Sequence, residues 1–182
     1  MKKYMQLCSF AVALAVGGFV LSWATERRFA DSDAVIWAQP VEFVSVKDRE
    51  RQLKCMADNI YFEAATEPTE GKIAVAQIVM NRVDSADFPN DPCAVIYQKN
   101  VFYQRVVCQF SWYCDGSAQR QRIRQDLWRE GYDAAVLVMM EGFRLPSLQN
   151  ALYYHADYVN PQWRKTQVAK IGRHIFYQPR GV

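Results

Sequence analysis

Histidine and cysteine are scarce in this 182-residue sequence, which contains two histidines and five cysteines. Two histidines are too few for a metal site built from several histidine ligands, so we expect no metal and no cofactor. Five cysteines are too few for a disulfide scaffold that replaces a hydrophobic core, and no Cys-x-x-Cys motif is present. A thiol or metal enzyme is therefore the least favoured function class. Apolar residues are not scarce: they make up 51% of the chain, which excludes wholesale disorder.

The body of the chain also lacks an excess of either charge. The whole sequence has 22 basic and 19 acidic residues, a net charge of +3. Four of the basic residues and one acidic residue lie within residues 1–28, so residues 29–182 carry 18 of each sign. The positive charge belongs to the N-terminal segment and not to a binding surface. We therefore expect no nucleic-acid partner.

Residues 4–25 contain no charged side chain, and Lys2 and Lys3 precede them. At about 1.5 Å per residue, this run is long enough to cross a bilayer core of about 30 Å. It is either a signal peptide cleaved near Ala24 or an uncleaved signal-anchor, and its length favours the anchor. In both cases residues 1–28 direct export. The rest of the chain would then be secreted, or anchored in the inner membrane and facing the periplasm or cell wall.

Export bears on the four cysteines that follow this segment. Cys55, Cys93, Cys108 and Cys114 are even in number, and in an oxidising compartment two disulfides are the natural interpretation. Three pairings are possible. Cys108 and Cys114 are close enough to close a local loop, which leaves Cys55 to pair with Cys93.

Residues 29–47 are predicted to be a linker, and residues 48–182 one domain. Apolar residues at helical spacing predict a helix over residues 48–65. Pro68 ends it, and Thr69 is expected to cap a second helix over residues 70–83. This second helix is apolar on nearly every side, which is typical of a buried central helix.

A third long helix is predicted over residues 120–141. Residues 101–113 are rich in aromatic and β-branched residues and form either a strand or an aromatic loop. Two short strands are predicted at residues 152–155 and 171–177. The fold class is α+β, rich in helix, with a small antiparallel sheet near the C-terminus.

Glu63 is the first candidate for catalysis. On a helical wheel it falls about 80° from the centre of the apolar stripe of its helix, at the edge of the buried face. It also lies in the last turn, where the helix dipole disfavours a negative charge. Partial burial and this position both raise the pKa of a carboxyl group, as a general acid requires near neutral pH. The alternative is a solvated or ion-paired glutamate.

Residues 59–83, NIYFEAATEPTEGKIAVAQIVMNRV, resemble the opening motif of the SleB-type cell-wall hydrolases, which include spore-cortex-lytic enzymes. Further motifs similar to this family follow in order, so that the likeness covers about residues 53–177. They lie at residues 88–90, 93–98, 108–112, 114–116, 151–155 and 171–176. The chain departs from the family pattern at Ala65 and Thr66, where Arg-Gly is usual.

This resemblance implies a lysozyme-like catalytic core that cleaves peptidoglycan glycan strands between N-acetylmuramic acid and N-acetylglucosamine. Glu63 matches the single essential glutamate, acting as general acid and base in a lytic transglycosylase. Hydrolysis of the muramidase type is the nearest variant, and a non-catalytic wall-binding or scaffold protein is the alternative from another class.

Polar and aromatic side chains suit sugars, which present apolar C–H faces and many hydroxyl groups. Trp163 is either a sugar platform or a loop anchor, and the anchor is favoured. His155 would bind sugar or orient Glu63, whereas His174 is expected to be structural. The substrate-binding candidates are Tyr61, Glu67, Gln109, Phe110, Ser111, Tyr154 and His155.

Overall fold

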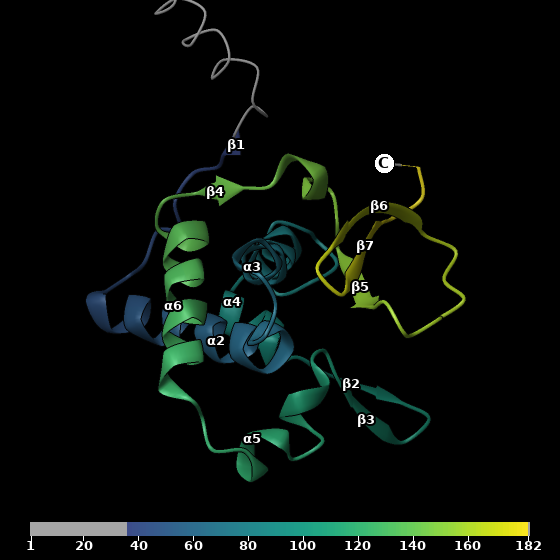
Figure 1. Ribbon diagram of the computed structural model, residues 1–182, viewed down its shortest axis with the longest axis horizontal. Coiled ribbons are helices and arrows are strands. Elements are labelled where there is room, and N and C mark those ends of the chain that lie inside the picture. The colour runs from purple at the N-terminus through teal and green to yellow at the C-terminus, as the bar shows by residue number, and fades with distance from the viewer. Residues whose placement is uncertain (1–35, 182) are drawn as a thin grey trace, which may run out of the picture. The chain divides into compact units, whose positions relative to one another are not determined.

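The computed structural model describes residues 36–181 (Figure 1). The chain divides into two units after Ala34, and all the described residues belong to the second unit. The predicted signal or anchor segment, residues 1–28, lies outside the described residues. Within residues 36–181, no helix has the length and apolar character needed to cross a bilayer.

Three helices form the core of this unit. Helix α2 (Val46–Ala64) begins at Ser45, whose hydroxyl accepts a hydrogen bond from the Asp48 backbone N–H at 3.1 Å. Helices α3 (Thr69–Val83) and α6 (Gln125–Met139) pack against it, and the short helix α4 (Pro92–Ile96) packs against α2 and α3 (Figure 1). The helix-rich α+β prediction is confirmed.

Helix α3 is buried on every side, as its sequence predicts. All the residues from Gly71 to Met80 are buried, because α2 and α6 cover one side and the C-terminal sheet covers the other. The predicted cap is wrong, however. Pro68 holds the N-cap position in extended conformation, and Thr69 is the first helical residue without a side-chain capping bond.

The predicted third helix is wrong at its start, because the chain breaks into two helices there. Helix α5 (Ser117–Arg120) is a single turn, and residues 121–124 precede α6 in a non-helical stretch. The backbone N–H of Arg124 donates to the Tyr61 hydroxyl at 3.1 Å, which fixes where α6 begins. Local sequence does not reveal a contact between residues 63 positions apart.

Two small antiparallel sheets flank the site described below. Strands β2 (Lys99–Phe102) and β3 (Arg105–Cys108) form a hairpin, followed by a 3₁₀ turn, η1 (Ser111–Tyr113). The C-terminal sheet has the order β5–β7–β6, with β5 (Tyr153–Ala156), β6 (Thr166–Ile171) and β7 (His174–Gln178). A 3₁₀ turn, η2 (Pro146–Leu148), precedes this sheet.

The strand predicted over residues 171–177 is the end of β6 and most of β7, joined by a tight turn. Gly172 has φ of 55°, and a Cβ atom there would lie 1.8 Å from the Glu67 carboxylate. The Glu67 carboxylate accepts a hydrogen bond from the Arg173 backbone N–H at 2.9 Å. Glycine is therefore required at this turn both by backbone conformation and by space.

Part of the predicted linker contacts the rest of the unit. Strand β1 (Ile36–Trp37) pairs with β4 (Phe143–Arg144), and the Val41 N–H donates to the Met139 carbonyl at 2.8 Å. The described part of residues 29–47 is thus held against the end of α6.

The two disulfides pair as the spacing suggested. Cys55 of α2 is bonded to Cys93 of α4, and Cys108 is bonded to Cys114 across η1. The first joins cysteines that are 38 positions apart in the sequence, and the second joins cysteines that are 6 positions apart.

Candidate active site

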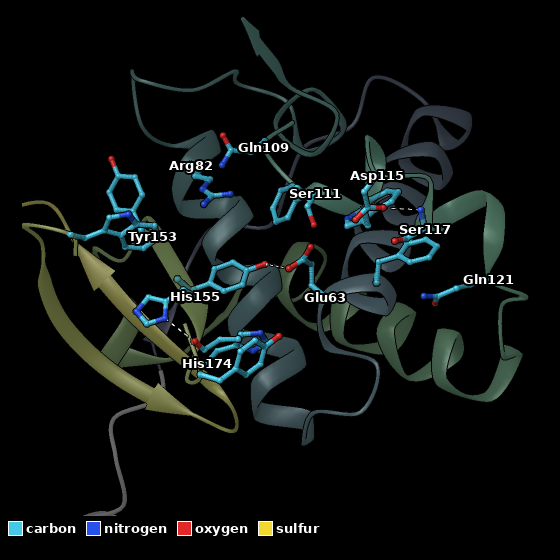
Figure 2. Close-up of a pocket in the computed structure, with 17 residues that line it drawn as sticks. Glu63, Arg82, Gln109, Ser111, Asp115, Ser117, Gln121, Tyr153, His155 and His174 are labelled. Atoms are coloured by element: carbon cyan, nitrogen blue, oxygen red, sulfur yellow. Dashed lines mark hydrogen bonds between the residues drawn. The ribbon is translucent and has the colours of Figure 1, made fainter. Parts of the chain in front are cut away.

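Glu63 lies in the last turn of α2, where the C-terminal sheet approaches the helix. The hydroxyl of Tyr154, on the edge strand β5, donates a hydrogen bond to Glu63 Oε2 at 2.9 Å (Figure 2). The two residues are 91 positions apart in the sequence. This contact joins the helical core to the C-terminal sheet.

Burial dominates the electrostatics of Glu63. It raises the pKa of the Glu63 carboxyl group, and the negative charge of Asp115 acts in the same direction. The hydrogen bond from Tyr154 and the positive charge of Arg82 oppose this rise by stabilising the carboxylate, but the net pKa stays raised. Burial also raises the pKa of Tyr154 well above its usual range, so its hydroxyl keeps its proton and donates. Glu63 therefore stays protonated to higher pH than a solvated glutamate.

Arg82, at the end of α3, is the main residue that sequence reasoning missed. Its side chain is buried, and its Nε donates to the Leu152 carbonyl at 2.9 Å. Its guanidinium carbon lies 5.4 Å from the centre of the Phe88 ring and 5.3 Å from that of Phe110. Among the described residues it forms no ion pair within 4.0 Å. One available signal was that the last turn of α3 carries an arginine shortly after the largely apolar run of residues 73–80.

Glu63 lines a cavity of about 520 Å³. In Figure 2, Tyr153 and His155 lie on one side of Glu63, whereas Ser117 and Gln121 lie on the other. The catalytic candidate thus stands between the two ends of the cavity. Its lining mixes carboxyl, amide, hydroxyl and aromatic groups from α2, α3, the η1 region and the C-terminal sheet.

Three of the predicted substrate-binding residues, Gln109, Phe110 and Ser111, line this cavity. The Cys108–Cys114 disulfide spans the segment that carries them. Trp112, in the same segment, is buried. Its Nε1–H donates a hydrogen bond to Asn59 Oδ1 at 3.0 Å, and its ring stacks on that of Phe62 with ring centres 4.6 Å apart. The polar–aromatic run is therefore both a cavity wall and a part of the core.

Tyr154 and His155 line the cavity as predicted, but their roles divide differently. Tyr154, and not His155, contacts Glu63. The His155 ring is bonded at Nε2 to the Tyr177 hydroxyl, 2.9 Å away, and at Nδ1 to the Ala156 carbonyl, 2.8 Å away. These two bonds fix the His155 ring against the sheet.

Tyr61 and Glu67 do not line the cavity, contrary to our expectation. The Tyr61 hydroxyl accepts a hydrogen bond from Arg124, and the Glu67 carboxylate accepts one from the β6–β7 turn. The structure thus uses both side chains to hold neighbouring segments in place. Sequence position alone could not distinguish these structural contacts from sugar binding.

Several further lining residues were not predicted to belong to the site, and Asp115, His174 and Trp163 are among them. Asp115 accepts a hydrogen bond from the Ser117 N–H at 2.7 Å, and its hydrogen bonds to Ser117 hold the pKa of its carboxyl group below the usual range. His174 packs its ring edge-on against Tyr154, and burial lowers the pKa of the imidazole. Trp163 forms part of the wall beside His155. Within residues 36–181, no three metal-ligating side chains gather into a metal site.

The sequence profile of the cell wall hydrolase family matches residues 66–177. The chain belongs to the cell wall hydrolase family. The matched range starts three residues after Glu63 and includes the other residues that line the cavity, apart from Phe62. Membership of the cell wall hydrolases rests on more than half of the chain.

Curated members of related sequence are spore cortex-lytic enzymes. The enzyme of Oceanobacillus iheyensis is 34% identical over 137 residues, which cover 70% of this chain and 41% of that protein. The enzyme of Bacillus subtilis is 30% identical over 154 residues, which cover 84% of this chain and 44% of that protein. This cell wall hydrolase thus spans less than half the length of those relatives.

Two solved structures have a similar fold. The catalytic domain of the Bacillus cereus SleB protein superposes with a TM-score of 0.54 at 27% identity, covering 76% of this chain and 95% of that chain. The catalytic domain of the germination-specific lytic transglycosylase SleB of Bacillus anthracis gives the same TM-score at 28% identity, covering 76% and 100%. The matched part of this chain therefore corresponds to a whole SleB catalytic domain.

Proposed function

We propose that this chain cleaves the glycan strands of peptidoglycan between N-acetylmuramic acid and N-acetylglucosamine, as a lytic transglycosylase. The observation that carries the proposal is the Glu63 carboxyl group, with its raised pKa and its hydrogen bond to Tyr154. It lies between the two ends of a polar and aromatic cavity. Family membership and the SleB relatives support the same substrate.

The reaction needs one group that first gives a proton and then takes one. Protonated Glu63 donates its proton to the glycosidic oxygen, the bond to the muramic C1 breaks, and positive charge develops on the muramic ring. The Glu63 carboxylate then takes the proton of the C6 hydroxyl group, whose oxygen bonds to C1 and closes a 1,6-anhydro ring. This restores the protonated acid, and no second carboxylate is required.

Tyr154 and Arg82 support the second half of this cycle. Once Glu63 has lost its proton, the Tyr154 hydroxyl donates to a charged oxygen, and the buried Arg82 cation lies in the same low-dielectric surroundings. Both groups therefore stabilise the base form of Glu63. Burial favours the protonated form of Glu63, whereas Tyr154 and Arg82 favour its carboxylate form, so the surroundings support both forms.

Tyr154→Phe tests this balance. We expect kcat/KM on purified sacculi to fall roughly tenfold, because a charge-assisted hydrogen bond is lost. We also expect the limb on which activity falls with rising pH to move to higher pH, because the hydrogen bond that lowers the Glu63 pKa is gone. A pH–rate profile of the two proteins measures both effects. An unchanged limb would show that Tyr154 does not act on the essential acid.

Hydrolysis of the muramidase type is the second candidate, and Asp115 is the observation that favours it. Asp115 is a second carboxyl group in the cavity lining, with a pKa held low, so it would be ionised where Glu63 is protonated. An acid and a base on two carboxyl groups are what hydrolysis of a glycosidic bond requires. Asp115→Asn abolishes activity if Asp115 activates water, and leaves strand cleavage in place if Glu63 acts alone.

Release of soluble fragments from sacculi would exclude the alternative that this chain is a non-catalytic wall-binding protein. Wild-type protein incubated with purified sacculi should release muropeptides that mass spectrometry detects. Binding to sacculi without release would favour the scaffold role.

We also propose that the site works outside the cytoplasm. The uncharged N-terminal segment predicts export, and the two disulfides fit an oxidising compartment. On this proposal, residues 1–28 are the anchor or signal peptide, and the cell-wall hydrolase domain of residues 48–182 faces the peptidoglycan.

A further inference from the structure

An aromatic cluster forms one end of the cavity, on the side of Glu63 where Tyr153 and His155 lie (Figure 2). Trp163, in the loop between β5 and β6, stands at its centre. The Trp163 ring centre lies 6.2 Å from that of Tyr153, 5.5 Å from that of His155 and 5.8 Å from that of Tyr177, each with edge-to-face geometry. The cluster therefore joins a loop to two strands of the C-terminal sheet.

The exposure of Trp163 does not fit a loop anchor. Its side chain is 41% exposed, although it packs against three rings, whereas the anchoring Trp112 is 6% exposed. Trp163 also belongs to the cavity lining. A large apolar ring thus remains open to the same cavity that contains Glu63.

The surroundings hold this ring in a fixed place. His155 and Tyr177 stack with ring centres 5.2 Å apart and share a hydrogen bond of 2.9 Å, which makes a rigid base. Lys165 Nζ lies 3.2 Å from the centre of the Tyr153 ring, which fixes the neighbouring side of the cluster. Before Trp163, Gln162 has φ of 52°, a left-handed conformation that is unfavourable for a residue with a side chain. Backbone strain of this kind concentrates at ligand sites.

We propose that Trp163 is the platform of a sugar-binding subsite for the glycan strand, at the end of the cavity opposite Ser117 and Gln121. The proposal rests on the proposed function and adds a residue that determines how the strand is held. The apolar C–H face of a pyranose ring packs on the exposed indole ring. The Lys165 ammonium group beside the cluster donates hydrogen bonds to sugar hydroxyl groups.

The position of the subsite determines what it does. Trp163 has no hydrogen bond to Glu63 and lies beside His155, whose ring is tied to the sheet and not to the catalytic carboxyl group. It therefore acts on the binding of a strand and not on proton transfer. Its contribution appears in KM, whereas kcat for bound substrate stays nearly unchanged.

The test compares Trp163→Ala with Trp37→Ala in the full-length protein, using purified sacculi as substrate. Trp37 is a matched control, because its side chain is 58% exposed and packs edge-to-face on Phe143, but it is absent from the cavity lining. We expect Trp163→Ala to raise KM about tenfold with kcat within about twofold of wild type. Trp163→Phe should restore most of the affinity, and Trp37→Ala should match wild type.

Trp163→Leu covers the case in which the alanine variant fails to fold, because leucine keeps apolar packing but offers no aromatic face. It should raise KM as alanine does. A wild-type KM in Trp163→Leu or Trp163→Ala, or a fall in kcat at unchanged KM, would overturn the proposal.

Binding in a Glu63→Gln background separates this subsite from the proposed reaction. Wild-type protein that releases no fragments overturns the proposed function, whatever Trp163 does. If the wild type cleaves and the Glu63→Gln variant only binds, adding Trp163→Ala should weaken sacculus binding about tenfold. Adding Trp37→Ala should leave binding unchanged. Equal binding of these two double variants would overturn the subsite alone.

Discussion

Glu63→Gln should reduce the release of muropeptides from sacculi by roughly 10³-fold, the size of effect that a general acid and base contributes. Glutamine keeps the shape of the side chain and can still accept the hydrogen bond from Tyr154. It has no proton of suitable acidity to give to the glycosidic oxygen. The loss should therefore appear in kcat, while binding of the variant to sacculi stays close to that of wild type.

The control for this prediction is Glu67→Gln. Glu67 lies four residues further along the chain, but its carboxylate contacts the β6–β7 turn and not the cavity. A glutamine oxygen can still accept the Arg173 N–H, so we expect near-wild-type activity. Near-wild-type activity in Glu63→Gln would require another acid, and Asp115 would be the first to test.

Removal of the Cys55–Cys93 disulfide should produce the largest loss of stability. This bond joins α2 to α4 across a separation of 38 residues. By the chain-entropy account, replacing both cysteines with serine lowers the free energy of unfolding by about 4 kcal/mol. Because domains of this size are stable by about 5–15 kcal/mol, the loss should be plain in urea or thermal unfolding of the oxidised and variant proteins.

The Cys108–Cys114 disulfide is the matched comparison. It joins cysteines that are 6 positions apart, so the same chain-entropy account gives a smaller loss in the free energy of unfolding, about 2 kcal/mol. That loop, however, carries Gln109, Phe110 and Ser111 of the cavity wall. We therefore expect this second double variant to lose more activity and less stability than the first. The reverse order would contradict the division of roles between the two disulfides.

Helix α3 shows what the sequence could predict about the fold. Its residues are apolar on nearly every side, and this pattern occurs where a helix is surrounded by other elements. Strand β6 was missed except for Ile171, because its residues do not alternate between apolar and polar and only Ile171 is buried. The start of α6 was misplaced because a tyrosine 63 residues earlier fixes it.

In the candidate site too, the sequence indicated some residues and missed others. Glu63 was singled out because its place on the α2 wheel and in the last turn both concern local geometry, and the motif resemblance pointed to the same residue; the structure places it in the cavity lining. Tyr154 was assigned to the substrate, but its contact with Glu63 depends on how the sheet docks on the helices. Arg82 and Trp163 were not placed in the site because their position depends on contacts made only in the folded chain.

In the proposed reaction, Glu63 alone performs both proton transfers, and the C6 hydroxyl group, not water, attacks the muramic C1. Digestion of sacculi in water enriched in ¹⁸O, followed by mass spectrometry of the released muropeptides, tests it most directly. We expect 1,6-anhydro ends that contain no ¹⁸O, together with their loss in Glu63→Gln. Reducing muramic ends that carry one ¹⁸O atom would contradict it and assign the reaction to hydrolysis.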